Sequence, residues 1–281
     1  MRELHVRYIE DTVMQLLIKA NRELPQSIVE AVKVAQLNEQ SKLAKEVCDD
    51  LLLNIETAKK LDIPLCQDTG MAVVFVELGQ DVHLIGGGLE DAINKGVSKA
   101  YINGNLRSSI VEDPLTRTQN TGDNTPAIIH LNLVEGEHVK ISVFPKGFGS
   151  ENMSKLKMFT PSATTDEIKE FIVSVVKDAG GNPCPPIIVG VGIGGNFEHS
   201  AYLAKKALCR NITLRNKNKF YANLETDLLN QINALGIGPQ GFGGLTTAFA
   251  VNIEYAPTHI AGLPVAVNIG CYMARSASVV I

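Results

Sequence analysis

Residues 66–70, with the sequence Cys-Gln-Asp-Thr-Gly, place a thiol, an amide, a carboxylate and a hydroxyl in four consecutive positions. Gly70 permits a turn, so the four residues before it are expected to project from a loop. A thiolate can bind a soft metal, and a carboxylate beside it can carry a proton. The alternative for this stretch on its own is a polar turn behind a buried cysteine.

Two further cysteines stand out by their surroundings. Cys184 lies within residues 183–186 (Pro-Cys-Pro-Pro), where the prolines make the backbone rigid, which suits a fixed ligand better than a core filler. Cys271 follows a predicted strand and Gly270. Three thiols would leave one coordination position of a metal open, as catalytic sites do. Of the remaining two, Cys48 falls in a predicted helix and Cys209 ends another, and both are interpreted as small buried residues.

The five cysteines are odd in number and widely spaced. This pattern argues against a secreted disulfide framework and against a structural zinc module, which needs closely spaced pairs. A reducing compartment, the cytoplasm, is therefore expected. Residues 1–7 are polar and show no secretory segment, and no apolar run is long enough to span a bilayer.

Composition narrows the class of protein further. The chain has 281 residues, of which 45% are hydrophobic and 20% charged, as in an ordinary soluble globular protein. The formal net charge of -4 gives no basic excess that would indicate nucleic acid or an anionic membrane as a partner.

Three loops carry candidate binding residues. Residues 104–126 form a long polar stretch without helix or strand periodicity, and loops of this length are usually functional or disordered. Arg107 in this stretch could contact an anion, or it could be a solvated surface residue. Gly147 and Gly149 lie in residues 146–152, where successive N–H groups could form an anion-binding nest or a simple flexible loop. His259 lies between two predicted strands, and a surface position is its alternative.

Residues 190–195 (Gly-Val-Gly-Ile-Gly-Gly) lie between a predicted strand and a predicted helix, as a dinucleotide-binding fingerprint would. The glycine spacing does not fit that motif, and no acidic residue ends a second strand about 20 residues later. Close packing of the helix on the strand, or the approach of another ligand, explains these glycines better.

The fold class predicted from these patterns is α+β, with an N-terminal helical region over about residues 1–62 and mixed, largely antiparallel sheets flanked by helices. Residues 128–134 and 139–144 alternate in hydrophobicity and are predicted to pair as a hairpin. The chain shows no clean linker or internal repeat, so residues 1–281 are predicted to form one domain. Helices are expected within 8–60 and at 89–101, 165–178, 196–208 and 220–235, and further strands at 72–78, 187–193, 246–255 and 264–269.

Taken together, five motifs in order resemble the alpha subunit, or N-terminal half, of the class I, iron–sulfur fumarate hydratases, a region shared with L(+)-tartrate dehydratase. Each motif alone is weak, but the series spans nearly the whole chain. The motifs are residues 66–70, 122–126 (Gly-Asp-Asn-Thr-Pro), 146–152 (Lys-Gly-Phe-Gly-Ser-Glu-Asn), 183–196 and 264–271.

This resemblance implies a 4Fe–4S cluster held by Cys66, Cys184 and Cys271, with the fourth iron free to bind substrate. The implied reaction is the reversible hydration of fumarate to (S)-malate, a step of the tricarboxylic acid cycle. By position, the substrate contacts would be Gln67, Arg107, Gly147 and Gly149, and the catalytic residues would be Asp68 and His259. Asp68 would handle a proton or orient the iron-bound hydroxyl.

Single-chain members of the resembled family continue into a second domain, whereas this sequence stops ten residues after Cys271. A partner beta subunit is therefore expected, in a heterotetramer of two alpha and two beta subunits that binds a small dicarboxylate. Three alternatives stay open: L(+)-tartrate dehydratase with the same fold, a cluster-free structural or regulatory subunit, and a nucleotide-binding protein built on residues 190–195.

Overall fold

A computed structural model describes all 281 residues of the chain. They form two compact units, each with its own hydrophobic core. The first unit comprises Met1–Pro25, Ile55–Phe148 and Arg275–Ile281, and the second comprises Gln26–Asn54 and Gly149–Ala274.

The first unit is built on a four-stranded sheet in the order β10-β5-β2-β4. Strand β2 (Met71–Gly79) is apolar and buried over most of its length, so it takes a central position with a neighbour on each side. Its neighbours are β4 (Ile128–Val134), which is parallel to it, and β5 (Val139–Lys146), which is antiparallel. Strand β10 (Ala277–Val280) extends the sheet beyond β5.

The predicted hairpin between residues 128–134 and 139–144 is wrong. Both segments are strands, but β2 lies between them, and they do not pair with each other. Where β2 ends, the amide of Gly79 donates to the carbonyl of His138 and the amide of Gln80 donates to that of Val134. The more apolar strand β2 thus takes the central position between β4 and β5, which would be neighbours in a simple hairpin.

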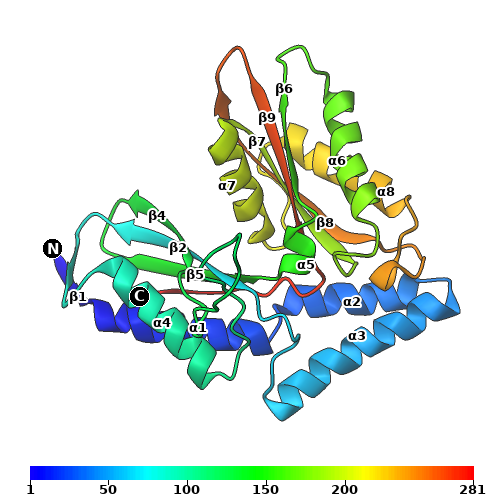
Figure 1. Cartoon of the computed structure of the whole chain (residues 1–281). Helices are drawn as coiled ribbons and strands as arrows, with labels where there is room; N and C mark the ends of the chain where they lie inside the picture. Colours follow the sequence, from blue (N-terminus) through cyan, green and yellow to red (C-terminus); the bar gives the residue numbers. More distant parts are fainter. The chain divides into compact units, whose positions relative to one another are not determined.

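Helices α1 (Val6–Arg22) and α4 (Leu89–Asn103) cover one face of this sheet (Figure 1). Their apolar sides meet Ala72, Val74 and Val76 of β2 in the core of the unit. A separate parallel pair joins β1 (Arg2–His5) to β3 (Val82–Ile85).

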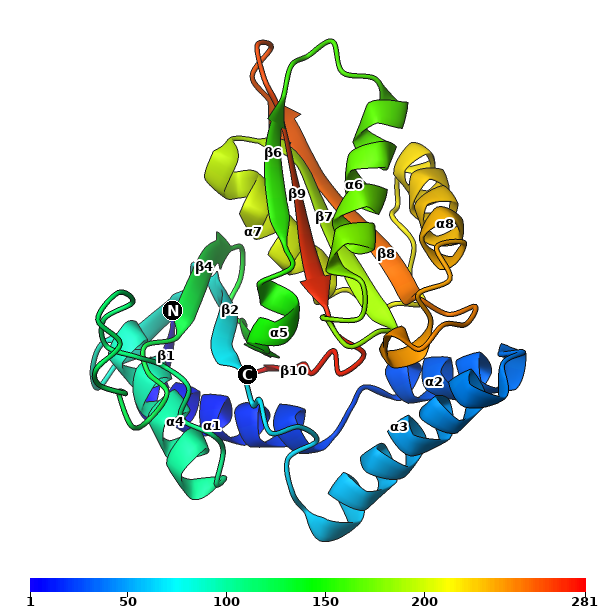
Figure 2. The same cartoon turned by 45° about the vertical axis from the view of Figure 1, so that its right-hand side comes forward.

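The second unit contains a four-stranded sheet in the order β6-β9-β7-β8. Figures 1 and 2 show α7 on one face of the sheet and α6 with α8 on the other. The main core lies beneath α6 and α8. The elements are β6 (Lys155–Phe159), α6 (Thr165–Ala179), β7 (Ile187–Gly195), α7 (Phe197–Leu208), α8 (Lys219–Asn233), β8 (Ala248–Thr258) and β9 (Leu263–Gly270).

The glycines of β7 let α7 lie directly on the strand. A Cβ added to Gly190 would collide with the carbonyl oxygen of Ala204, and one added to Gly192 would collide with that of Ser200. The preference for close helix–strand packing over a nucleotide loop is therefore confirmed for these two positions.

The N-terminal helical region is confirmed, with its helices at α1, α2 (Gln26–Asn38) and α3 (Lys42–Leu61). Between α2 and α3, the buried carboxylate of Glu39 accepts hydrogen bonds from the amides of Leu245 and Thr246, at 2.7–3.0 Å. Helix α6 begins with a capping box, in which the side chains of Thr164 and Glu167 each accept a hydrogen bond from the backbone amide of the other residue.

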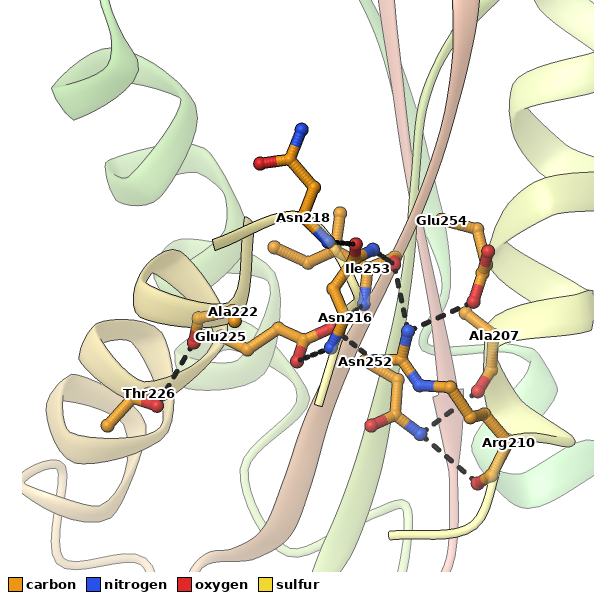
Figure 3. A network of polar contacts seen from close by, with 10 residues as sticks. All are labelled: Ala207, Arg210, Asn216, Asn218, Ala222, Glu225, Thr226, Asn252, Ile253 and Glu254. Carbon is orange, nitrogen blue, oxygen red and sulfur yellow. Dashed lines mark hydrogen bonds and ion pairs between the residues drawn. The ribbon is translucent and has the colours of Figure 1, made fainter. Parts of the chain in front are cut away.

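Figure 3 shows a buried polar network on α8 and β8. The carboxylate of Glu225, which is fully buried, pairs with Arg210 and accepts hydrogen bonds from the amides of Ile253 at 2.8 Å and Asn216 at 3.0 Å. Arg210 also pairs with Glu254 at 3.0 Å. The network fixes the segment between α7 and α8 against the edge of the sheet.

The α+β fold class is confirmed, with mixed sheets flanked by helices. Four of the strand pairs are antiparallel and three are parallel. No helix has both the length and the apolar character that crossing a membrane would require. Short elements that the sequence did not reveal are β1, β3, β6, β10, the helix α5 (Phe148–Glu151) and a 3-10 turn at Pro239–Gly241.

Candidate functional site

In the first unit, Asp68 has a fixed carboxylate. Its Oδ1 accepts a hydrogen bond from the amide of Gly70 at 3.0 Å, and its Oδ2 accepts one from the amide of Phe148 at 2.9 Å. The side chain is therefore held between its own loop and the start of α5. Orientation of this kind is what a group that handles a proton or a hydroxyl requires.

The loop that carries Asp68 is clamped from beneath by two buried side chains. The hydroxyl of Tyr101 lies 2.9 Å from the carbonyl oxygen of Thr69 and 2.7 Å from that of Gly70, so these two acceptors share its one proton, and burial raises the pKa of this phenol. The amide nitrogen of Asn124 also donates to the carbonyl of Gly70, at 3.0 Å. Gly70 itself has φ +79° and lies so close to Lys146 that an added Cβ would meet backbone atoms at 2.8 Å.

Arg107 lies near the start of the long polar loop at 104–126, and its backbone is hydrogen-bonded to the same turn. Its amide donates to Oγ1 of Thr69 at 3.0 Å. The side chains of Arg107 and Gln67 are exposed, and neither makes a hydrogen bond or ion pair within the chain. The structure thus brings Arg107 beside the Asp68 loop with its guanidinium unused.

Gly147 also adjoins this site, at the end of β5. A Cβ added there would lie 3.1 Å from Oδ2 of Asp68 and 3.5 Å from Nη2 of Arg275. Sequence reasoning missed Arg275, which is 2% exposed and donates through Nη1 to the main-chain oxygen of Asp68 at 2.7 Å. A signal for it was present, because Arg275 is the one Lys, Arg, Asp or Glu that follows Glu254.

In the second unit, Cys184 and Cys271 lie at one end of the sheet. Strands β7 and β9 are antiparallel, so the segment that leads into β7 and the residue that follows β9 share that end. The amide of Tyr272 donates to the carbonyl of Cys184 at 3.3 Å, which joins the two cysteine segments. Cys184 has φ +56° and is exposed, and Cys271 is partly exposed.

Two glycine-containing segments surround Cys184. The amide and the side-chain Nε2 of Gln240 both donate to the carbonyl of Pro185, at 2.8 Å and 2.7 Å. An added Cβ at Gly149 would lie 3.8 Å from the carbonyl oxygen of Asn182, so this predicted substrate contact adjoins the turn before Cys184. The loop at 236–247 therefore supports the cysteine segment through the amide and the side chain of Gln240.

His259 lies at the other end of the same sheet. It is exposed in the turn between β8 and β9, where its Nδ1 accepts from the amide of Ala261 at 3.1 Å. Strand β9 runs from Leu263 to Gly270, and at about 3.3 Å per residue it separates the two ends by about 25 Å. The structure does not bring His259 together with Cys271 in one copy of this unit.

The five cysteines divide into two with desolvated thiols and three that reach the surface. Burial raises the pKa of Cys48 to about 11, with Glu39 and Asp49 adding to the effect. Cys209 is partly exposed as a residue, but desolvation of its thiol raises its pKa to about 12. Both thiols therefore disfavour the thiolate that metal binding needs, whereas Cys66, Cys184 and Cys271 all reach the surface.

No group of three or more His, Cys, Asp and Glu side chains that could hold a metal ion is formed. Cys66 belongs to the first unit, while Cys184 and Cys271 belong to the second. The donor chemistry of these three accessible thiols still fits an iron–sulfur cluster, because such clusters are held by cysteine thiolates.

Comparison with known proteins agrees with the order of these motifs. The sequence model of the family described as Fumarate hydratase (Fumerase) matches residues 10–280. A protein of Methanocaldococcus jannaschii with the provisional name L(+)-tartrate dehydratase subunit alpha is 42% identical over 275 residues, which cover 96% of each chain. L(+)-tartrate dehydratase subunit alpha of Escherichia coli is 31% identical over 278 residues, and that of Shigella boydii 30% over 278 residues; each match covers 98% of this chain and 91% of the relative. The chain belongs to the fumarate hydratase (Fumerase) family.

Proposed function

We propose that this chain is the alpha subunit of an iron–sulfur hydro-lyase that adds water reversibly to fumarate to give (S)-malate. The observation that carries the proposal is the family match over residues 10–280 together with a carboxylate, Asp68, held by two amides two residues from an accessible cysteine. We also propose that residues 1–281 act together as one domain of this enzyme.

Cys66, Cys184 and Cys271 would hold the cluster. The contrast with Cys48 and Cys209 supports this choice, since the raised pKa values of those two thiols oppose deprotonation. A bound 4Fe–4S cluster would supply a Lewis acid for the hydroxyl and a carboxylate of the substrate. Chain connectivity adds support, because three residues separate Cys271 from Arg275, whose side chain binds the carbonyl of Asp68.

The residues of this chain would bind and orient the dicarboxylate. The unused guanidinium of Arg107 can form a forked pair with a substrate carboxylate, and Gln67 beside it offers an amide. The small size of Gly147 and Gly149 leaves the main chain open to an anion. Asp68 would then orient the water or hydroxyl, or carry its proton, because both its carboxylate oxygens are already directed by hydrogen bonds.

The role proposed for His259 needs a second copy of the chain. One copy of the second unit keeps His259 and Cys271 at opposite ends of β9. If His259 contacts substrate, it would do so at the cysteines of the other alpha subunit. A His259→Ala chain mixed with an excess of Cys184→Ser chain should then recover activity through sites that pair an intact His259 with an intact Cys184.

The partner proposed for this chain is a beta subunit, in an assembly of two alpha and two beta subunits. The names of the relatives, which call each of them a subunit alpha, support this assignment. The chain alone should show almost no hydratase activity, and activity should appear when the partner is added. Full activity of the purified chain without a partner would contradict this part of the proposal.

The experiment that tests the cluster measures iron and acid-labile sulfide per chain after anaerobic reconstitution. About four irons per chain are expected for the wild type, with loss in Cys66→Ser, Cys184→Ser and Cys271→Ser. Cys48→Ser and Cys209→Ser are matched controls and should retain the iron. Absence of iron in the wild type would favour a cluster-free structural subunit, and iron that is indifferent to the first three substitutions would contradict this set of ligands.

A second candidate reaction is the dehydration of L(+)-tartrate to oxaloacetate. The names of the relatives from Methanocaldococcus jannaschii and Escherichia coli favour it. The two candidates share the fold and the elimination chemistry, so they are separated by turnover rather than by binding. The deciding measurement is kcat/KM for fumarate, (S)-malate and L(+)-tartrate in one preparation of the assembled enzyme.

A further inference from the structure

Arg275 is a buried cation without a carboxylate partner. It is 2% exposed, no acidic side chain lies within ion-pair distance, and its Nε has no hydrogen-bond partner. Removing a guanidinium from water without a compensating charge is costly, and Arg is almost never fully buried unless paired. An apolar side chain could fill the same space in the core without the desolvation penalty. The presence of Arg275 therefore indicates a role other than packing.

The contacts of Arg275 converge on the loop that carries Asp68. Its Nη1 donates to the main-chain oxygen of Asp68 at 2.7 Å and to Oδ1 of Asn21 at 3.0 Å. Asn21 is itself fully buried, and its carbonyl accepts a hydrogen bond from the amide of Leu65 at 2.9 Å. Arg275 and Asn21 therefore hold the two ends of the segment from Leu65 to Asp68.

The second terminal nitrogen lies on the same side as the Asp68 carboxylate. Nη2 would be 3.5 Å from a Cβ at Gly147, and Oδ2 of Asp68 would be 3.1 Å from that same point. Because Gly147 has no side chain, the guanidinium and the carboxylate face the same small space at the end of β5. The positive charge of Arg275 thus stands behind the group that we assign to proton or hydroxyl handling.

We propose that Arg275 is the positioning residue for Asp68, and that it sets the placement of the carboxylate by holding the carbonyl of the same residue. This proposal rests on the function proposed above. Arg275 is carried by the segment that follows Cys271, so the same segment would supply a cysteine ligand and secure the loop of another, Cys66. The residue acts through Asp68 and needs no contact with substrate.

The test uses three variants of Arg275 and one matched control. Arg275→Met removes the charge and both hydrogen bonds, Arg275→Lys keeps the charge without the fork, and Arg275→Ala leaves room for added methylguanidinium. The control is Arg22→Met, since Arg22 also lies in the first unit, donates to a main-chain oxygen and has a buried Nε without a partner. Arg22 differs because Asp62 neutralises it at 2.7 Å and it does not contact the Asp68 loop.

Hydrogen exchange of the complete chain gives a readout that needs no activity. In Arg275→Met, the amides of Leu65 and Gly70 should exchange at least tenfold faster, while those in the core of α4 keep their wild-type rates. Arg275→Lys should lie between the two, and Arg22→Met should match the wild type. Unchanged exchange at Leu65 and Gly70 in both Arg275→Met and Arg275→Lys would overturn the proposal.

Kinetics of the assembled enzyme give the second readout. Arg275→Met should lower kcat about a hundredfold with KM changed by less than threefold, and methylguanidinium should restore part of kcat in Arg275→Ala. Wild-type kcat in Arg275→Met would overturn the proposal while leaving the hydro-lyase assignment intact. If the wild type turned over none of the dicarboxylates, the assignment would fail, and the exchange experiment alone would decide whether Arg275 holds the loop.

Discussion

The two units each bury a charge, but only one of them holds it in a direct ion pair. In the second unit, Glu225 is fully buried and meets Arg210 together with two main-chain amides, so its charge and its lone pairs are satisfied (Figure 3). In the first unit, Arg275 is equally inaccessible yet has only neutral oxygens as partners. The ion pair of Glu225 with Arg210 holds two segments of the second unit together. The unpaired Arg275 in the first unit is an unfavourable buried charge beside a candidate catalytic group.

This difference separates two uses of a buried charge. A compensated pair fixes a segment, here the residues between α7 and α8, and contributes little else. An uncompensated charge costs stability, and sites that perform chemistry are where proteins accept such costs. The comparison can be tested by removing each charge in turn.

The largest expected effect is on stability in the second unit. Glu225→Leu should lower the free energy of unfolding by about 3–5 kcal/mol. The substitution removes the main ion-pair partner of the half-buried Arg210, and it removes the acceptor of two main-chain amides. Urea denaturation measures the change, and iron incorporation per folded chain should stay at the wild-type value.

A double variant serves as the control for this prediction. Arg210→Met combined with Glu225→Leu replaces the pair with apolar side chains, and it should recover at least half of the lost stability. A double variant as unstable as Glu225→Leu would show that these two residues do more than form a compensated pair.

The next effect concerns the thiols. At pH 8 a thiol with a pKa of about 11 is about 0.1% ionised, so Cys48 should alkylate about a hundredfold more slowly than an ordinary thiol, and Cys209 more slowly still. Peptide mass spectrometry after timed iodoacetamide treatment measures each site in the native chain without cluster. Cys184 should react first, and the rates should converge in urea.

The raised pKa values of Cys48 and Cys209 also make the folding stability depend on pH. Burial raises the pKa of Cys48 and Cys209 above that of the unfolded chain, so folding favours their protonated forms. Their contribution to stability is complete below the unfolded pKa of about 8.5 and is lost as the pH rises toward 11. Stability that stays constant from pH 8 to pH 10.5 would contradict the raised values.

A smaller effect is expected when the uncompensated charge is removed. Arg275→Met loses two hydrogen bonds but also relieves the desolvation of an unpaired cation, so its free energy of unfolding should change by less than about 1.5 kcal/mol. Urea denaturation beside Glu225→Leu gives the direct comparison. A loss as large as that of Glu225→Leu would show that Arg275 also holds segments of its unit together.

An effect of similar size concerns the hydrogen bonds of Tyr101 to the Asp68 loop. Tyr101→Phe removes the hydroxyl that contacts the carbonyls of Thr69 and Gly70, and about 1–2 kcal/mol of stability should be lost. The same denaturation experiment measures it, and Thr164→Ala, which removes a helix cap far along the chain, is a control of similar size. No loss would mean that a water molecule replaces the hydroxyl as the donor to these carbonyls.

Local patterns in the sequence were sufficient for most helices and for separating Cys48 and Cys209, the two cysteines in or at the end of helices, from the other three. The N-terminal helices, α4 and α6 to α8 follow from apolar periodicity and capping residues, which depend on neighbours within a few positions. Cys184 between prolines and Cys66 before a polar turn were distinguishable from Cys48 and Cys209 because helical surroundings imply burial. The structure agrees that those two thiols are desolvated. The use of the other three cysteines as ligands stays a prediction.

Tertiary structure alone decided what depends on residues far apart in the chain. The expected hairpin at 128–144 was wrong because β2, which precedes it by about 50 residues, is more apolar and lies between its strands. Likewise, Arg275 and Asp68 meet across 207 positions, and sequence spacing carries no record of such a contact. His259 is close to Cys271 in sequence but lies a strand away, since an extended chain separates the ends of a short segment as far as possible.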